Sequence, residues 1–198
     1  VQPTLVAVRG AYAQFDQNRD QGCRNDEFTF TDLSTSNADI IAWGWNYGNG
    51  ITDSSINGSM TYSTTGYFDV SLYIEDENGC SDMVTKNDTV FISSPTPAFT
   101  VIDRICLGDS AEFINSSSDN SLSYVWDFGD DSTSTEESPT YIYMQGGLYD
   151  VSLTASDTLG CDSTILATEI IQVDTLNIQF TSDETLASCP PMLVGFDD

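Results

Sequence analysis

The chain has 198 residues, of which 31 are acidic, five are basic and none is histidine, and its formal net charge is −26. A surface of this sign repels phosphate backbones and anionic headgroups, so we expect no nucleic-acid partner and no direct membrane insertion. The lack of histidine excludes Ser-His-Asp and Cys-His nucleophile systems and histidine-ligated metals. A glycosidase would need only a carboxylate pair, but so many acids make chance pairs unavoidable, and we predict that the chain is not an enzyme.

The chain shows strand signals and no helix signal. Short alternating apolar runs are bounded by Gly, Asn, Asp and Ser, and no segment has a 3.6-residue apolar period. In the first half we expect strands near residues 13–16, 27–32, 41–47, 60–63, 67–75 and 82–92. In the second half we expect them near residues 97–101, 111–116, 122–128, 141–144, 148–156 and 163–173. About seven short strands in about 80 residues predict a Greek-key β-sandwich, occurring twice.

The second half repeats the first at a fixed distance of 81 residues. Three blocks share this offset: Trp43-Gly-Trp-Asn-Tyr-Gly-Asn-Gly50, Gly66-Tyr-Phe-Asp-Val-Ser-Leu72 and Gly79-Cys80. Self-similarity at a fixed period indicates a duplicated folding unit. We therefore predict the end of a preceding repeat at 1–10, a first repeat at 11–94, a second at 95–175, and a truncated third repeat at 176–198.

Aromatic residues alternate in the third strand expected for each unit. The side chains of Trp43, Trp45 and Tyr47 share one face of that strand, as do those of Tyr124, Trp126 and Phe128. We interpret this face as the core of the sandwich, with a carbohydrate-stacking platform as the alternative.

Four segments of the second unit resemble the PKD repeat, an immunoglobulin-like β-sandwich: Tyr124-Val-Trp-Asp-Phe-Gly-Asp130, Pro139-Thr-Tyr-Ile-Tyr143, Gly147-Leu-Tyr-Asp-Val-Ser-Leu-Thr154 and Gly160-Cys161. The resemblance implies an all-β chain of tandem immunoglobulin-like (PKD) Greek-key β-sandwiches with a core motif of Trp45, Trp126, Phe128 and Tyr149. The first unit is similar but looser. Phe68 stands where Tyr149 stands, and it lacks the hydroxyl of a tyrosine corner, so that corner should be absent or weaker there.

The resemblance also implies a function. The cysteine pattern is similar to that of repeats in large surface proteins and adhesins exported by type IX secretion. It implies an extracellular, non-catalytic stalk, adhesive or assembly module of a large bacterial cell-surface protein or appendage. Its partners would be neighbouring repeats of the same long chain, further copies, or surface glycans and proteins. PKD repeats also accompany secreted chitinases and proteases, so an accessory region of a hydrolase is an alternative, as is a carbohydrate-binding module.

Five cysteines in an acidic β-repeat indicate a disulfide framework formed in an oxidising compartment. Pairing within each unit would give Cys23–Cys80 and Cys106–Cys161. In a sandwich wound this way, Cys106 and Cys161 lie at opposite ends, about 20 Å apart, whereas a disulfide tolerates Cα separations of about 4.4–6.8 Å. We therefore favour an inter-domain bond between Cys23 and Cys161 and keep pairing within units as the alternative.

One loop has the spacing of a calcium site, the one cofactor that the sequence suggests. Asp16, Asn18, Asp20 and Glu27 occupy positions 1, 3, 5 and 12 of an EF-hand-like loop. Gln21 replaces the glycine of position 6, and strands flank the loop. A polar turn between strands is the alternative hypothesis.

Several Asp-Ser or Asp-Thr tripeptides resemble the O-glycosylation pattern of bacteria that use type IX secretion. Solvated β-turns are the alternative reading. The candidate hydroxyls are those of Thr89, Ser110, Ser132, Thr158, Ser163 and Thr175.

Overall fold

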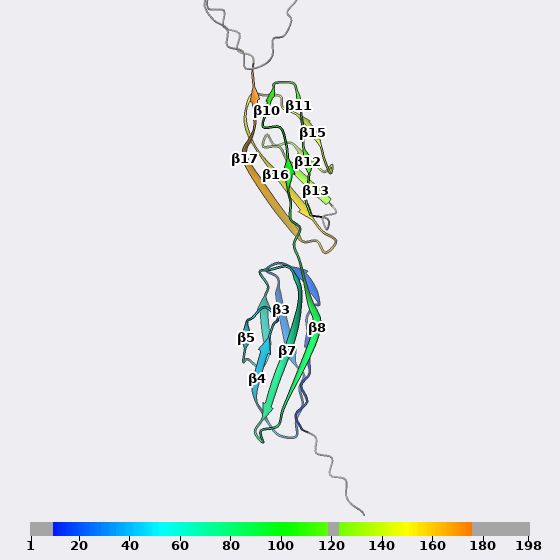
Figure 1. Cartoon of the computed structure of the whole chain (residues 1–198), viewed down its shortest axis with the longest axis vertical. Coiled ribbons are helices and arrows are strands. Elements are labelled where there is room, and N and C mark those ends of the chain that lie inside the picture. Colours follow the sequence, from blue (N-terminus) through cyan, green and yellow to red (C-terminus); the bar gives the residue numbers. More distant parts are fainter. Residues whose placement is uncertain (1–9, 119–122, 176–198) are drawn as a thin grey trace, which may run out of the picture. The chain divides into compact units, whose positions relative to one another are not determined.

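The computed structural model describes residues 10–118 and 123–175. The chain divides into two compact units between Ser94 and Pro95. Each unit is all-β, which confirms the predicted fold class (Figure 1). The predicted end of a preceding repeat and start of a third repeat fall outside the described residues, apart from Gly10.

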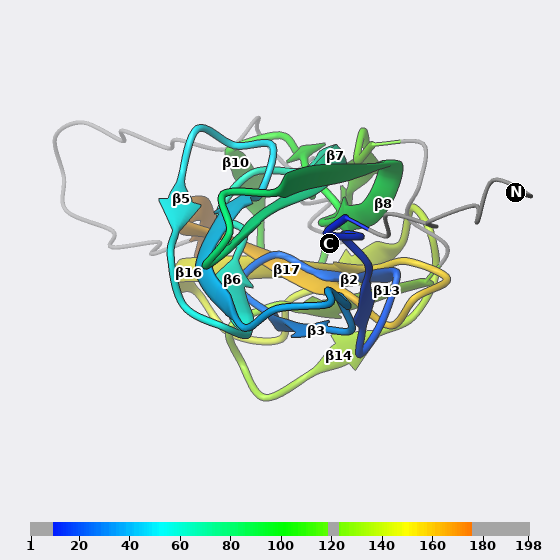
Figure 2. The same ribbon diagram turned by 90° about the horizontal axis from the view of Figure 1, so that it is seen from below.

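The first unit is a sandwich of two sheets. One sheet has the strand order β1-β3-β6 and the other has the order β2-β8-β7-β4-β5. Figure 2 shows β3 on the opposite side of the unit from β7 and β8. The strands are β1 (Phe15–Gln17), β2 (Gln21–Cys23), β3 (Glu27–Asp32), β4 (Ile40–Asn46), β5 (Thr52–Asp53), β6 (Gly58–Thr61), β7 (Gly66–Asp76) and β8 (Ser81–Ser93).

The second unit repeats this plan. Its larger sheet has the order β10-β17-β16-β13-β14, and its second layer consists of the pairs β9-β12 and β11-β15. Phe113 interrupts β11 and β12 but keeps the layer joined, because its amide donates to the carbonyl of Pro139. The strands are β9 (Phe99–Thr100), β10 (Arg104–Cys106), β11 (Ser110–Glu112), β12 (Ile114–Asn115), β13 (Ser123–Asp127), β14 (Thr133–Ser134), β15 (Thr140–Ile142), β16 (Gly147–Ser156) and β17 (Asp162–Asp174).

Each unit has its own core, formed by alternate residues of the strands. In β7 every second side chain from Phe68 to Asp76 is buried, which is the period expected for a strand with one face against a core. The first core contains Ala13, Phe15, Phe28, Phe30, Trp45, Tyr47, Tyr62, Phe68, Val70, Leu72, Ile74, Val90 and Ile92. The second contains Ala111, Phe113, Trp126, Phe128, Tyr143, Val151, Leu153, Ile171 and Val173.

The last strand of each unit runs the whole length of that unit (Figure 1). Both β8 and β17 have 13 residues, a length of about 40 Å at ~3.3 Å per residue. Each is antiparallel to its preceding long strand, and its C-terminal part also pairs in parallel with a three-residue strand, β2 or β10. In residues 10–118 and 123–175 there is no helix, and so none that could cross a membrane.

A glycine turn fits against the same β-bulge in both units. The bulge lies between Phe68 and Val70 in β7, and at the equivalent place in β16. Gly48 has a φ of +79°, and a Cβ there would lie 2.5 Å from the carbonyl oxygen of Asp69. Gly129 meets Asp150 in the same way. A side chain at either turn would therefore displace the bulge, which explains the glycine in Trp-Asn-Tyr-Gly and Trp-Asp-Phe-Gly.

Candidate functional site

The chain enters and leaves each unit at opposite ends. We call the end at which it enters the leading end and the end at which it leaves the trailing end. In the first unit the amide of Ala13 donates to Asp82 at 2.8 Å, so the start of β8 lies at the leading end. The last residue of β8, Ser93, pairs with Cys23 at the trailing end.

The cysteines follow the same plan in both units. Cys80 immediately precedes β8 and lies at the leading end, whereas Cys23 lies at the trailing end. In the second unit Cys106 pairs with Asp174, the last residue of β17, and Cys161 immediately precedes this strand. Each unit thus has one cysteine at each end.

Equivalent turns hold the two leading-end cysteines. The carboxylate of Asp76 accepts hydrogen bonds from the amides of Asn78 and Cys80 at 3.0 and 2.9 Å. The carboxylate of Asp157 accepts from Leu159 and Cys161, both at 2.9 Å. The backbone around the two cysteines is therefore fixed in the same way.

The oxidation states of the cysteines differ. Cys23, Cys106 and Cys161 are each disulfide-bonded, and Cys80 is a free, exposed thiol. The alternative pair Cys23–Cys80 is therefore wrong in this structure. The alternative pair Cys106–Cys161 is also wrong, because the 13 residues of β17 separate these cysteines by about 40 Å. The bond between Cys23 and Cys161 stays a prediction.

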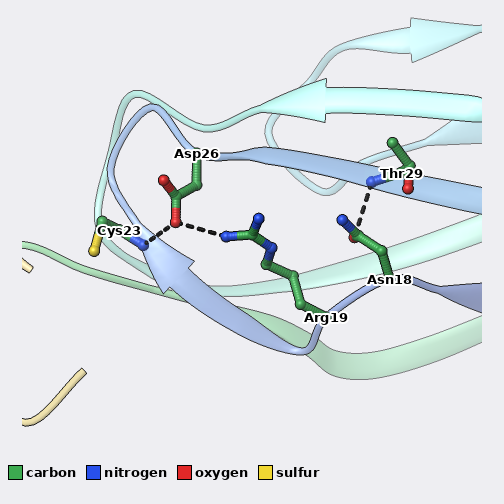
Figure 3. Close-up of polar contacts among 5 residues, drawn as sticks. All are labelled: Asn18, Arg19, Cys23, Asp26 and Thr29. Atoms are coloured by element: carbon green, nitrogen blue, oxygen red, sulfur yellow. Dashed lines mark hydrogen bonds and ion pairs between the residues drawn. The ribbon is translucent and has the colours of Figure 1, made fainter. Parts of the chain in front are cut away.

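The trailing end of the first unit is organised by one carboxylate (Figure 3). Asp26 accepts hydrogen bonds from the amide of Cys23 at 2.9 Å and from the guanidinium of Arg19 at 2.8 Å. The amide of Asp26 donates back to the carbonyl of Cys23 at 3.0 Å. Arg19 also lies over the ring of Phe28, 5.6 Å from its centroid. This arrangement holds Cys23 in a fixed turn beside the end of β8.

The predicted calcium ligands do not converge. Asp16 pairs with Thr31 in the β1–β3 ladder, so Glu27 lies four residues away along β3, about 13 Å. The side-chain oxygen of Asn18 accepts from the amide of Thr29, which Figure 3 shows. Within the described ranges no three His, Cys, Asp or Glu residues are grouped so that they could hold a metal ion. The four-residue calcium site is therefore corrected to the polar turn that was its alternative, with Arg19 supplying the local positive charge.

The core motif is held by buried polar atoms as well as by packing. The indole nitrogen of Trp45 donates to the carbonyl of Ser55 at 3.0 Å, and that of Trp126 donates to Glu136 at 2.9 Å. Because these acceptors lie beyond the next turn, each indole ties the third strand of its unit to the loop that follows β5 or β14.

Two tyrosines outside the predicted core motif have an equivalent role. The hydroxyl of Tyr62 donates to the carbonyl of Tyr47 at 3.0 Å, and that of Tyr143 donates to Phe128 at 3.1 Å. Both rings are fully buried. The available signal was the repeat itself, because a tyrosine occurs at this place in both units.

The predicted difference between Phe68 and Tyr149 is present. The hydroxyl of Tyr149 donates to the carbonyl of Gln145, four residues upstream, at 2.9 Å. The Tyr149 ring packs on Tyr143 at 4.2 Å between centroids, and Phe68 packs on Tyr62 at 4.3 Å. The first unit therefore keeps the ring contact and lacks the hydrogen bond.

The first unit also has a strongly perturbed tyrosine and two perturbed carboxyl groups. Burial, followed by the nearby carboxylate of Asp53, raises the pKa of Tyr47 to about 12. Hydrogen bonds from Ser55 lower the pKa of Asp53. The hydroxyl of Ser36, 2.6 Å from the Asp76 carboxylate, is the main cause of the lowered pKa of Asp76. These shifts arise in turns and in the core and do not form an acid–base pair.

The carbohydrate reading depended on exposed aromatic rings. Trp43 is half-buried, and its indole nitrogen donates to the carboxylate of Asp32 on the opposite sheet at 2.7 Å. A shallow groove beside β5 is lined by residues 43–46, 52–54, 71 and 83. Its only aromatic residues are Trp43 and Trp45, and Trp45 is buried. This groove therefore offers no fully exposed ring for a sugar to stack on.

The candidate glycosylation sites differ in accessibility. Thr89 is only 8% exposed, so its residue offers little room for a glycan. The other five candidates are exposed or half-buried, and Ser110, Thr158 and Thr175 are exposed.

Comparison with known proteins gives the family. A family model described as "PKD domain" matches residues 11–92 and again residues 93–173. Over 66 residues the chain is 48% identical to the pre-pro-metalloprotease PrtV of Vibrio cholerae, covering 32% of this chain and 7% of that protein. Over 85 residues it is 42% identical to a microbial collagenase of Vibrio alginolyticus, covering 39% and 10% of the two chains. The similarity is thus confined to a small part of each curated relative.

A solved domain gives a consistent match. The PKD1 domain of the Vibrio cholerae metalloprotease PrtV is 41% identical, with a TM-score of 0.38, and the match covers 42% of this chain and all of that domain. The relatives are matched through their PKD regions. Because PKD domains are non-catalytic accessory modules, the two matched regions have no reaction of their own.

Proposed function

The chain belongs to the PKD domain family, and we propose that its two domains act as a non-catalytic extracellular spacer within a larger bacterial protein. The observation that carries this proposal is the course of the chain through each unit. It enters at the leading end and leaves at the trailing end, about 40 Å away along a 13-residue strand. Each domain therefore adds length between the segments on either side of it.

The strand pairing suits a spacer under tension. Antiparallel ladder hydrogen bonds lie perpendicular to the strands. A pull on the trailing end of β8 acts along this strand, so it loads the bonds to β7 and β2 together in shear. The same holds for β17 between β16 and β10. Neither terminal strand can be peeled away one bond at a time by an axial pull.

Two observations support an extracellular location. Three of the four described cysteines are disulfide-bonded, and such bonds persist in oxidising compartments. The matched relatives include a pre-pro-metalloprotease and a microbial collagenase. Antibodies against the chain should label intact source cells or the culture fluid. Antigen found only after the cells are broken open would contradict the location.

The spacer role is tested by stretching single molecules of the whole chain after full reduction. We expect two rupture events, each lengthening the chain by roughly 250 Å, since some 80–85 residues extend at ~3.5 Å each and replace a folded length of about 40 Å. A spacer that bears tension should give resolved peaks. If the chain lengthens smoothly without rupture events, the units do not bear load and the proposal is wrong.

Within this role, we place the chain in the stalk or adhesive region of a large cell-surface protein, where neighbouring repeats of the same chain are its first partners. The internal duplication supports this placement, because repeated modules lengthen an array. The second candidate is an accessory region of a secreted protease, and the proteolytic relatives favour it.

Binding experiments separate the two candidates. The intact chain should be offered collagen, chitin and an array of surface glycans. Saturable binding to collagen or chitin would favour the accessory role, and binding to cell-surface glycans or proteins would favour the adhesive one. A chain that binds none of them fits a plain stalk. Trp126→Ala, which disrupts a core, and Tyr73→Ala, on the exposed face of β7, distinguish loss of fold from loss of a surface contact.

A further inference from the structure

We propose that Cys23 and Cys161 are bonded to each other, so that one disulfide links the trailing end of the first domain to the leading end of the second. The proposal goes beyond the spacer role, because it assigns how the junction is held. It starts from two facts about separate units: Cys23 and Cys161 are each disulfide-bonded.

The covalent chain limits which cysteines Cys23 can reach. The amide of Arg24 donates to the carbonyl of Ser93 at 3.1 Å, which places Cys23 beside the last residue of β8. Ser93 is three residues from Thr96, a Cα path of at most about 11 Å. Cys23 therefore lies within about 20 Å of Thr96, whatever the angle between the two domains.

Thr96 lies at the leading end of the second unit, where Cys161 also lies. The carbonyl of Thr96 accepts from the amide of Ser118 at 3.0 Å. The next described strand, β13, begins at Ser123, which pairs with Ser156, and Ser156 pairs with Asp162. Cys161 directly precedes Asp162.

The other described cysteines do not fit as partners. Cys80 is free and lies at the opposite end of the first unit from Cys23, about 40 Å away along β8. Cys106 lies at the trailing end of the second unit, about 40 Å along β17 from Cys161. A bond from Cys23 to either would need a Cα separation of about 4.4–6.8 Å. Among the described cysteines only Cys161 can meet this limit.

Local contacts already hold both sulfur-bearing residues in place. The carboxylate of Asp26 fixes the amide of Cys23, and the carboxylate of Asp157 fixes the amide of Cys161. Forming the bond removes one proton from each thiol and two electrons in total. An oxidised disulfide-exchange partner, such as oxidised glutathione or an oxidoreductase disulfide, accepts them and becomes two thiols.

The bond would change the path of tension through the chain. A pull between Gly10 and Thr175 would pass along the chain to Cys23, across the disulfide, and on from Cys161. The 13 residues from Gly10 to Cys23 and the 14 residues from Cys161 to Thr175 would remain extensible. The 138 peptide steps from Cys23 to Cys161 would carry no tension. The linker and most of both domains would thus be bypassed.

Peptide mapping tests the pairing directly. The whole chain is made in an oxidising compartment and cut, without reduction, by trypsin and a glutamate-specific protease. Cys23 then falls in peptide 20–24, Cys80 in 78–86, Cys106 in 105–112, Cys161 in 138–169 and Cys189 in 185–198. We expect peptide 20–24 linked to 138–169. A link from 20–24 to any other cysteine peptide overturns the proposal.

Thiol counting with matched variants gives a second test. In Cys161→Ser, the thiol of Cys23 should become reactive to a maleimide without reduction, and the label should map to peptide 20–24. Cys80→Ser is the control and should leave Cys23 unreactive. If Cys161→Ser leaves Cys23 protected, the bond is to another cysteine and the proposal is wrong.

Single-molecule stretching reads out the bypass. Reduction should add about 480 Å to the maximum extension, the length of 138 residues at ~3.5 Å each. A bond from Cys23 to Cys106 would release 83 residues, about 290 Å, so the two pairings give different lengths. A gain near 290 Å, or no gain, contradicts the proposed bond.

Discussion

The two domains differ at the surface and at one corner but use the same internal hydrogen bonds. In both, an indole nitrogen donates to a carbonyl 10 residues downstream, and a buried tyrosine hydroxyl donates to a carbonyl 15 residues upstream. The corner hydrogen bond made by Tyr149 has no counterpart at Phe68. The comparison teaches that the fold tolerates loss of an exposed hydrogen bond and keeps those whose loss would leave a buried carbonyl unpaired.

The largest expected effect tests whether the cores are separate. Trp45→Ala should destabilise the first domain by about 3–5 kcal/mol, and Trp126→Ala should do the same to the second. Hydrogen exchange followed by mass spectrometry, on the whole reduced chain, assigns the loss of protection to residues. Each variant should affect its own domain. Loss of protection in both domains from either variant would show that the cores unfold together.

The next prediction concerns the shared tyrosine. Tyr62→Phe and Tyr143→Phe each remove a hydroxyl and leave a buried carbonyl oxygen unpaired, which should cost about 1–3 kcal/mol in either domain. Denaturant titration with domain-resolved exchange measures the two losses. Similar losses support equivalent roles, and a negligible loss in one domain would mean that water replaces the hydroxyl there.

Alkaline pH should single out Tyr47, whose place in the second domain is taken by Phe128. The folded pKa of Tyr47 is raised from 10.0 to about 12. Its contribution to stability is fully present below pH 10 and is lost as the pH rises towards 12, because only the unfolded chain ionises readily there. Tyr47→Phe should flatten the fall in stability of the first domain between pH 10 and 12. An unchanged slope would assign the fall to other groups.

A reciprocal exchange sharpens the comparison at the corner. Tyr149→Phe should destabilise the second domain by about 0.5–1.5 kcal/mol through loss of its bond to Gln145. Phe68→Tyr should stabilise the first domain by a similar or smaller amount if its new hydroxyl reaches Thr64, the residue equivalent to Gln145. Thermal melts of both variants measure the changes. A destabilised Phe68→Tyr would show that the first corner has no room for the hydroxyl.

The smallest expected effect is that of calcium. Chelation at constant ionic strength should leave the melting temperature of the first domain unchanged, because Asp16 and Glu27 lie about 13 Å apart along the strands. Asp16→Asn provides the matched variant and should respond to calcium as the parent does. A rise in melting temperature with calcium in the parent, absent in the variant, would restore the metal site.

Most of the fold could be predicted because alternation and repetition are strong signals. The long strands β7, β8, β16 and β17 were located to within one or two residues, since every second side chain is apolar and glycine turns bound them. The short strands β2, β5, β10 and β14 were missed. They have two or three residues and are held by pairing with β8, β4, β17 and β13, so no local pattern marks them.

The candidate site was predicted less well. The calcium spacing failed because ligand spacing in sequence assumes a compact loop, whereas β1 and β3 extend Asp16 and Glu27 in opposite directions. The placement of cysteines at opposite ends of a unit followed from strand direction, and the β10–β17 register bears out that placement. Which cysteine is free could not be predicted, because the turns around Cys80 and Cys161 are the same in sequence and hydrogen bonding.

The acidity of the chain has a consequence that follows from its turns. The carboxylates of Asp32, Asp53, Asp76, Asp130 and Asp157 each accept a backbone amide two residues downstream. Part of the net charge of −26 is thus required by the turns and cannot be removed without loosening them. Packed side by side on a surface, such molecules would repel one another over about 10 Å at 0.1 M salt. A dense coat of them would therefore swell in dilute media and tighten in salty media, without any change in the fold of a single molecule.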